Sequence, residues 1–183
     1  MTRIPPVDPA NLDAQQQAIY DNILKTYKRV PPPIAVWLHR SAMCDPLEKL
    51  GHYVRYSTCL PARLSEFVIL LMAKHWHAQY AWVVHKPIAL SGGLAPEIIE
   101  AVRTGEKPSF TQPDEALVYE FVTTLNQTRK MPKELYERAI AILGRDGVLD
   151  LTGIIGFYSL IVMGLTVFDF SLLPGQEPDL PPK

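Results

Sequence analysis

Residues 65–93 read SEFVILLMAKHWHAQYAWVVHKPIALSGG. From Phe67 to Met72 the stretch is apolar on every side, so periodicity alone does not separate a buried helix from a buried strand. The context favours a helix, because no paired strands with turn signals occur elsewhere in the chain. After His77 the pattern continues as a second helix, which the Ser91-Gly92-Gly93 sequence is expected to end. The stretch therefore predicts two consecutive buried helices.

Helical patterns also lie on both sides of this stretch. They cover residues 11–28, about 46–56, a segment that starts at 95, and then 114–128, 132–143 and 148–170. In the second of these, the expected apolar stripe is Leu47, Leu50 and Val54. Many of the 17 prolines cluster at the two ends and at positions 31–33. We expect an all-α protein with a single domain, residues 1–183, and proline-rich extended arms at both ends.

Composition and charge indicate which kinds of binding partner to expect. The chain has 183 residues, of which 48% are hydrophobic, and its net charge is −1. This balance gives no electrostatic reason to expect nucleic acid or an anionic membrane, and a small, partly apolar ligand fits better. The two cysteines, Cys44 and Cys59, have neither redox nor metal-ligand spacing. No secretory signal is recognisable in Met1–Pro9, so we expect a cytoplasmic protein.

One segment tests the expectation that no membrane is involved. Residues 151–168 contain no charged side chain and approach the length needed to span a bilayer. Glycine, serine and threonine dilute the apolarity, and acidic residues flank the segment without a nearby basic anchor. We therefore expect a helix buried between protein surfaces, in the core between two subunits.

Residues 66–93 resemble the central motif of the carboxymuconolactone decarboxylase and alkylhydroperoxidase D superfamily. In that motif a helix with a glutamate leads into a second helix, which bears Cys-x-x-Cys followed four residues later by histidine. Glu66 falls on the glutamate and His85 on the histidine, whereas Ala78 and Ala81 stand in place of the two cysteines. Residues 147–158 also resemble the long C-terminal helix of a branch without cysteines. The resemblance covers about residues 47–170.

The resemblance implies an alkylhydroperoxidase D-like helical bundle that assembles as a homo-oligomer, a trimer or a hexamer, with sites near subunit interfaces. Ala78, Ala81 and His85 are spaced i, i+3 and i+7, so we expect them on one face of a helix. Without the cysteines, thiol peroxidase chemistry is not expected. Glu66 and His85 remain as a proton-transfer pair.

Such a pair suits the other reaction that the resemblance implies, the decarboxylation of a small unsaturated lactone acid. We expect a cofactor-free lyase of aromatic-compound catabolism that acts on a small carboxylated ring or lactone, with double-bond isomerisation as a related activity. Glu66 and His85 are the predicted catalytic residues, in unassigned acid and base roles. No metal site is predicted. Four neighbouring residues are predicted to bind substrate: Arg63, His75, His77 and Tyr80.

The sequence is also compatible with two alternative functions. Glu66 and His85 are also compatible with a purely structural hydrogen-bonded pair, in which case the chain is a non-catalytic binding or assembly module. His75, His77 and His85, with Glu66, are also compatible with a metal-dependent enzyme. The aromatic residues Trp76, Tyr80 and Trp82 are assigned to packing.

Overall fold

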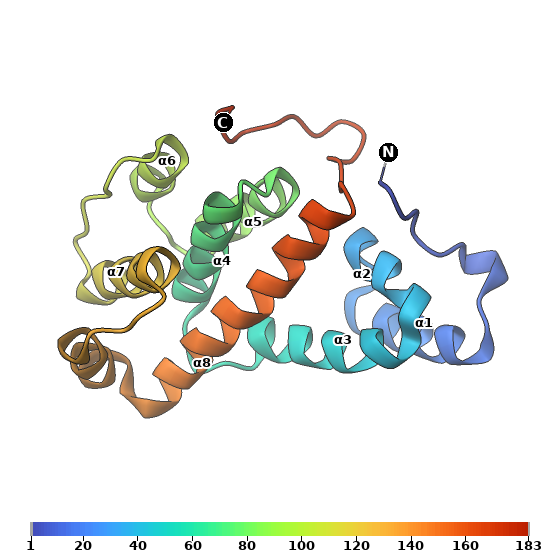
Figure 1. The fold of residues 1–183 in the computed structure, drawn as a ribbon, viewed down its shortest axis with the longest axis horizontal. Helices are drawn as coiled ribbons and strands as arrows, with labels where there is room; N and C mark the ends of the chain where they lie inside the picture. The colour runs from blue at the N-terminus through green and yellow to red at the C-terminus, as the bar shows by residue number, and fades with distance from the viewer. Residues whose placement is uncertain (1, 183) are drawn as a thin grey trace.

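Every regular element in the computed structural model, which describes residues 2–182, is a helix (Figure 1). The predicted all-α class is therefore confirmed for the described part of the chain. The α-helices are α1 (Ala14–Tyr27), α2 (Pro32–Trp37), α3 (Ser41–Tyr56), α4 (Ala62–Trp76), α5 (Gln79–Ser91), α6 (Pro96–Thr104), α7 (Pro113–Thr128) and α8 (Lys133–Val167), with short 3-10 helices at Pro9–Asn11 and Leu38–Arg40.

Helix α4 lies at the centre of the main hydrophobic core. It contacts α3, α5, α6, α7 and α8, and every residue from Leu64 to Ala73 is buried. A helix that is covered on all sides needs apolar side chains on all sides, which explains the uninterrupted apolar run in the sequence. Because α5 follows α4 after a two-residue connection, the two helices pack against each other along their lengths.

The N-terminal helices form a second, smaller core. Helix α1 begins at a capping box, in which the Asp13 carboxylate accepts from the backbone N–H of Gln16 and the Gln16 side chain accepts from that of Asp13. Helices α1 and α2 pack against α3. The buried side chains of this cluster are Val7, Ile19, Ile23, Ala35, Leu38 and Cys44.

In this region one helix was not predicted and two expectations were wrong. The sequence pattern did not predict α2, which begins at Pro32 because proline has the φ that the first turn of a helix needs. Helix α3 begins at Ser41 rather than near Pro46, since a proline in the second turn leaves only one carbonyl without its amide donor. Leu50 is 47% exposed, so it does not belong to the buried stripe.

Helix α8 contains both of the last two predicted helices. Gly144 has φ 72° and ψ 174°, a conformation that favours glycine, and it separates the helix into two segments that point in different directions (Figure 1). An 18-residue window of α8 has a mean hydropathy of 1.9, which would suffice to cross a membrane by length and composition. Buried core helices pass the same test, and 56% of this window is buried against the rest of the chain.

The C-terminal arm is tied to one side of α5. Asp179 accepts hydrogen bonds from Trp82 Nε1 at 2.6 Å and from Lys86 Nζ at 2.7 Å. Burial alone would raise the pKa of Asp179, but these two donors hold it below its usual range. The Gln79 side chain bonds the backbone of Leu180, whose own side chain is buried. Gln79, Trp82 and Lys86 are spaced i, i+3 and i+7, so the arm covers one face of α5.

Candidate active site

The structure brings the two predicted catalytic residues together. Glu66 lies on α4 and His85 on α5, and the distance from Glu66 Oε2 to His85 Nδ1 is 2.7 Å. The two residues are only 5% and 7% exposed, respectively. With the carboxylate beside Nδ1, the hydrogen-bond pattern assigns the proton of the neutral imidazole to that nitrogen. Nε2 is then left to accept or deliver a proton.

Tyr158, on α8, faces this second nitrogen. Its hydroxyl lies 3.4 Å from His85 Nε2, and the two rings meet edge to face with 5.3 Å between their centroids. Burial raises the pKa of Tyr158, and the nearby Glu66 carboxylate adds to the rise. Tyr158 is therefore a neutral phenol and a hydrogen-bond donor. A chain of three polar groups runs from α4 through α5 to α8.

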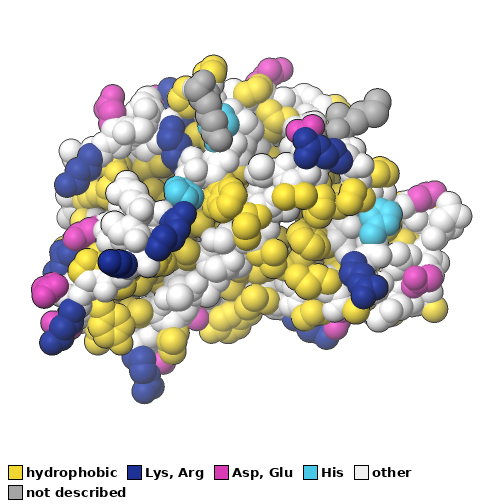
Figure 2. Space-filling view, viewed as in Figure 1, with side chains coloured by type: hydrophobic (Ala, Val, Ile, Leu, Met, Phe, Trp, Pro, Cys, Tyr) yellow, Lys and Arg dark blue, Asp and Glu magenta, His cyan; other side chains and the backbone are white. Residues whose placement is uncertain are grey.

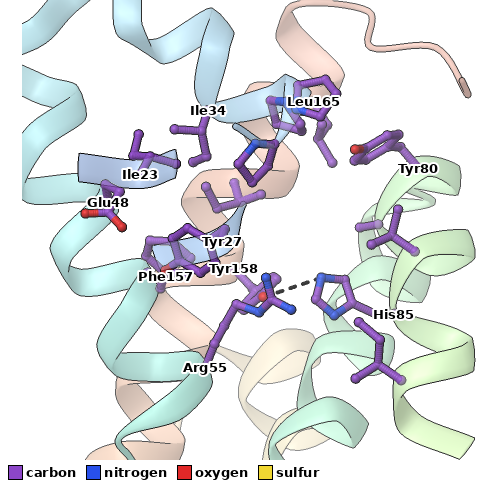
Figure 3. A pocket seen from close by; sticks show the side chains of 18 of the residues that line it. Ile23, Tyr27, Ile34, Glu48, Arg55, Tyr80, His85, Phe157, Tyr158 and Leu165 are labelled. Atoms are coloured by element: carbon purple, nitrogen blue, oxygen red, sulfur yellow. Dashed lines mark hydrogen bonds between the residues drawn. The ribbon is translucent and has the colours of Figure 1, made fainter. Parts of the chain in front are cut away.

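His85 and Tyr158 open onto a cavity of about 260 Å³ between α1, α2, α3, α5 and α8 (Figure 3). We call it the central cavity. Much of its wall is apolar, as is typical of sites for small organic molecules. The polar and charged side chains in the wall are Tyr27, Arg29, Glu48, Arg55, Tyr56, Tyr80, His85 and Tyr158.

The cysteine-replacing alanines occupy different places. The methyl group of Ala81 lines the central cavity next to His85. Ala78 is buried, but it precedes the first turn of α5 with φ −85° and ψ 86° and does not line the cavity. The expectation of one shared helical face is therefore wrong for Ala78, because that residue is not in helical conformation.

Helix α3 contributes polar residues that the sequence analysis missed. Glu48, Gly51 and Arg55 line the central cavity at i, i+3 and i+7 spacing. A Cβ atom at Gly51 would lie 2.8 Å from Phe157 Cζ, so the glycine lets α8 approach α3 here. Glu48 is 7% exposed. The sequence signal for this site was a pair of charged residues, Glu48 and Arg55, at helical spacing within an amphipathic helix. The predicted apolar stripe did not take these two residues into account.

Of the four predicted substrate-binding residues, only Tyr80 lines the central cavity, where its ring packs edge to face on Phe170 at 4.8 Å. Arg63 is instead held by Asp114 at 2.8 Å and by Glu115 at 2.7 Å. His75 is exposed and lines a separate pocket of about 140 Å³. His77 ends α4 in a left-handed conformation. A binding role for Arg63, His75 and His77 stays a prediction.

The three histidines of the metal alternative do not come together. His85 is buried in the wall of the central cavity, whereas His75 lines the other pocket. Within residues 2–182, no group of three or more histidine, cysteine or acidic side chains is placed to hold a metal ion. These residues therefore do not form the ligand set that the alternative needs.

Neither cysteine supplies a thiol to the central cavity. Cys44 is buried in the N-terminal core, where burial, assisted by Glu48, raises the pKa of its thiol to about 11. Cys59 is exposed, and it is absent from the cavity wall. The positions that would hold a reactive cysteine pair carry methyl groups instead.

No protein-family model and no curated protein sequence matches the chain. Several solved structures, however, have a similar fold. A cysteine-to-alanine variant of the debrominase Bmp8 in complex with 2,3,4-tribromopyrrole has a TM-score of 0.70 and 11% identity, with 93% of this chain and 91% of that chain covered. The apo form of Bmp8 has a TM-score of 0.71, 11% identity and coverage of 93% and 92%. A peroxidase-related protein from Silicibacter sp. TM1040 has a TM-score of 0.73, 12% identity and coverage of 92% and 88%. The chain therefore has the alkylhydroperoxidase D and carboxymuconolactone decarboxylase-like fold that the motif around Glu66 and His85 predicted.

Proposed function

We propose that this protein is a cofactor-free acid–base catalyst that acts on a small carboxylated ring or lactone, by decarboxylation or by double-bond isomerisation. One observation carries the proposal: His85 is held by Glu66 through Nδ1, while its Nε2 faces the central cavity beside the Tyr158 hydroxyl. An imidazole in this setting takes up a proton on one side while the carboxylate stabilises the resulting positive charge on the other.

In an isomerisation, His85 Nε2 removes a proton from the carbon that lies between a carbonyl group and a carbon–carbon double bond. The electron pair of that C–H bond passes into the carbonyl, and the enolate oxygen accepts a hydrogen bond from Tyr158. The imidazolium then returns its proton to the far carbon of the conjugated system, so that the double bond moves and no atom is lost. Glu66 positions the ring and is not itself in contact with substrate.

In a decarboxylation, the bond between the ring carbon and the carboxylate breaks, and its electron pair enters the carbonyl group, either directly or through the double bond. Carbon dioxide leaves, and His85 in its protonated form delivers the replacing proton to carbon. Both reactions use the same histidine, and neither needs a sulfur nucleophile.

The test follows protons at carbon. A panel of β,γ-unsaturated lactone acids is screened by saturation-transfer NMR, and each compound that binds is then incubated with the protein in D₂O. We expect deuterium to appear at the protonated carbon, with or without release of carbon dioxide, which is measured in parallel. Heat-denatured protein is the control. Compounds that bind in the central cavity, carry an acidic C–H bond and yet exchange no faster than the control would leave the chain as a binding module.

We also propose that the exposed side of α8 is covered by another copy of this chain. Leu149, Met163 and Val167 are 65%, 38% and 59% exposed, and nothing lies within 4 Å of a Cβ atom built on Gly153 or Gly156. Figure 2 shows hydrophobic side chains gathered across the middle of the face on which α8 runs. An apolar helix face with small residues accepts a second helix at close range.

Light scattering is expected to give a mass that is a multiple of the 20.6 kDa chain, with three or six copies. Leu149→Lys should shift the protein toward smaller species, because an ammonium group in an apolar interface is costly. Thr111→Lys adds the same charge to an exposed loop and should leave the mass unchanged. A monomeric mass for the unmodified chain contradicts this proposal.

A further inference from the structure

We propose that Arg55 binds the carboxylate of the substrate and thereby selects small monocarboxylates for the central cavity. The inference rests on the proposed function for the identity of the reacting site, but it concerns a residue on α3, outside the Glu66–His85 pair. Arg55 on α3 selects the anionic group of the substrate, whereas His85 on α5 transfers the proton.

Arg55 carries a charge without a partner. Within residues 2–182 its guanidinium makes no hydrogen bond or ion pair, and its Nε atom is buried and unsatisfied. Its contact is with the face of the Tyr56 ring, 5.0 Å from the centroid. Arg63, by contrast, is paired with two carboxylates. Buried polar atoms are usually satisfied, so a guanidinium in a cavity wall with an unsatisfied Nε and no ion-pair partner indicates that an anion from outside the chain completes it.

The position of Arg55 places such a ligand beside the reacting histidine. Figure 3 shows the Arg55 side chain reaching from α3 toward Tyr158 and His85. Burial raises the pKa of Tyr158, and the positive charge of Arg55 opposes this rise. Arg55 is therefore close enough to Tyr158 for its charge to affect the phenol. A carboxylate on Arg55 would lie within the same end of the cavity as His85 Nε2.

The acid on the same helix face does not neutralise Arg55. Glu48 is seven residues earlier, about 10 Å away along the helix axis. Its carboxylate interacts with Tyr27, where burial, and then Glu48, raise the pKa of the phenol. No ion pair joins Glu48 to Arg55 among the described residues. The anion that completes Arg55 must therefore come from outside this set of side chains.

The charge balance of the cavity points to a single carboxylate. Arg29 is the other basic residue in the wall, and it is exposed. One guanidinium fork matches one carboxylate, whereas a dianion such as phosphate needs more compensating charge in an apolar site. The rest of the ligand meets Val84, Ile88, Ile161 and Leu165, which favour a ring or short hydrocarbon body.

The test compares benzoate with benzamide, which has the same shape and no charge, by isothermal titration calorimetry. We expect the unmodified chain to bind benzoate at least about tenfold more tightly than benzamide, since a charge-assisted bidentate pair is replaced by neutral contacts. Arg55→Met should weaken benzoate binding by about tenfold or more and change benzamide binding by less than about threefold. Arg29→Met removes an equal charge from the exposed part of the wall and should cost less than about threefold.

Three results would overturn the inference: equal affinity for benzoate and benzamide, undiminished benzoate binding by Arg55→Met, or tighter binding of inorganic phosphate than of benzoate. If Arg55→Met does not fold, Arg55→Lys replaces it, and the charge without the fork should still lose several-fold affinity. Deuterium exchange separates this inference from the proposed function. Arg55-dependent benzoate binding without exchange of any bound acid refutes only the catalytic proposal, whereas exchange by a protein whose binding ignores Arg55 refutes only this inference.

Discussion

Replacing His85 with glutamine is expected to lower kcat for any substrate found in the D₂O assay by roughly 10²- to 10⁴-fold, the usual contribution of a positioned acid–base group. The glutamine amide can still donate to Glu66, but it is neither an acid nor a base near neutral pH, so it can neither take a proton from carbon nor deliver one to it. The substrate-binding wall is otherwise intact, so KM should change little. Steady-state kinetics by carbon dioxide release or NMR gives both constants.

Tyr158→Phe is the matched control for this variant, because it removes a hydroxyl that touches His85 and keeps the ring. We expect a smaller loss of kcat, of about tenfold, from the missing enolate donor. If His85→Gln keeps its kcat while its melting temperature falls, the Glu66–His85 pair is structural. The binding-module alternative then accounts for both residues.

Trp82→Ala should lower the free energy of unfolding by about 3–5 kcal/mol, which is a large part of the stability of an ordinary domain. Trp82 is 0% exposed, and its indole N–H donates to Asp179 in the C-terminal arm. The substitution therefore leaves a cavity in the main hydrophobic core and removes one of the hydrogen bonds that hold the arm on α5. Urea unfolding followed by circular dichroism measures the change.

Trp82→Phe separates the two contributions, since it keeps an aromatic ring in the core and removes only the N–H donor. We expect a cost of about 1–2 kcal/mol. Trp76→Ala, at a half-buried position on α4, should cost less than Trp82→Ala. An unchanged urea midpoint for Trp82→Ala would contradict the assignment of this residue to packing.

The sequence was most informative where one helix meets many others. The apolar run 67–72 belongs to α4, which is surrounded, and its lack of periodicity was itself the signal of a central element. The motif spacing placed Glu66 and His85 in one site because α4 and α5 are joined by a short connection and must pack together. Local pattern and tertiary contact coincide there.

The remaining site residues depend on contacts between distant parts of the chain. Tyr158 reaches His85 from 73 positions away. Arg63 was predicted to bind substrate because it is close to Glu66 in sequence, but the carboxylates that hold it are 51 and 52 positions away. Arg55 was passed over because its role depends on the closeness of α3 to α8, which Gly51 permits. Helix α2 was not predicted for a local reason: proline usually ends a helix, but here it occupies the first turn of one.

The central cavity lies where the two hydrophobic cores of the chain meet. Ile23, Tyr27 and Ile34 of its wall belong to the N-terminal core or pack on it, whereas Ala81 and Tyr158 belong to the main core. A molecule bound there contacts both hydrophobic cores. It therefore bridges two parts of the protein that the chain itself joins mainly through α3. Its binding energy adds to their cohesion, about 2.7 kcal/mol at a concentration of 100 Kd. The rise in melting temperature that follows can reveal the natural ligand in a metabolite mixture before any reaction is known.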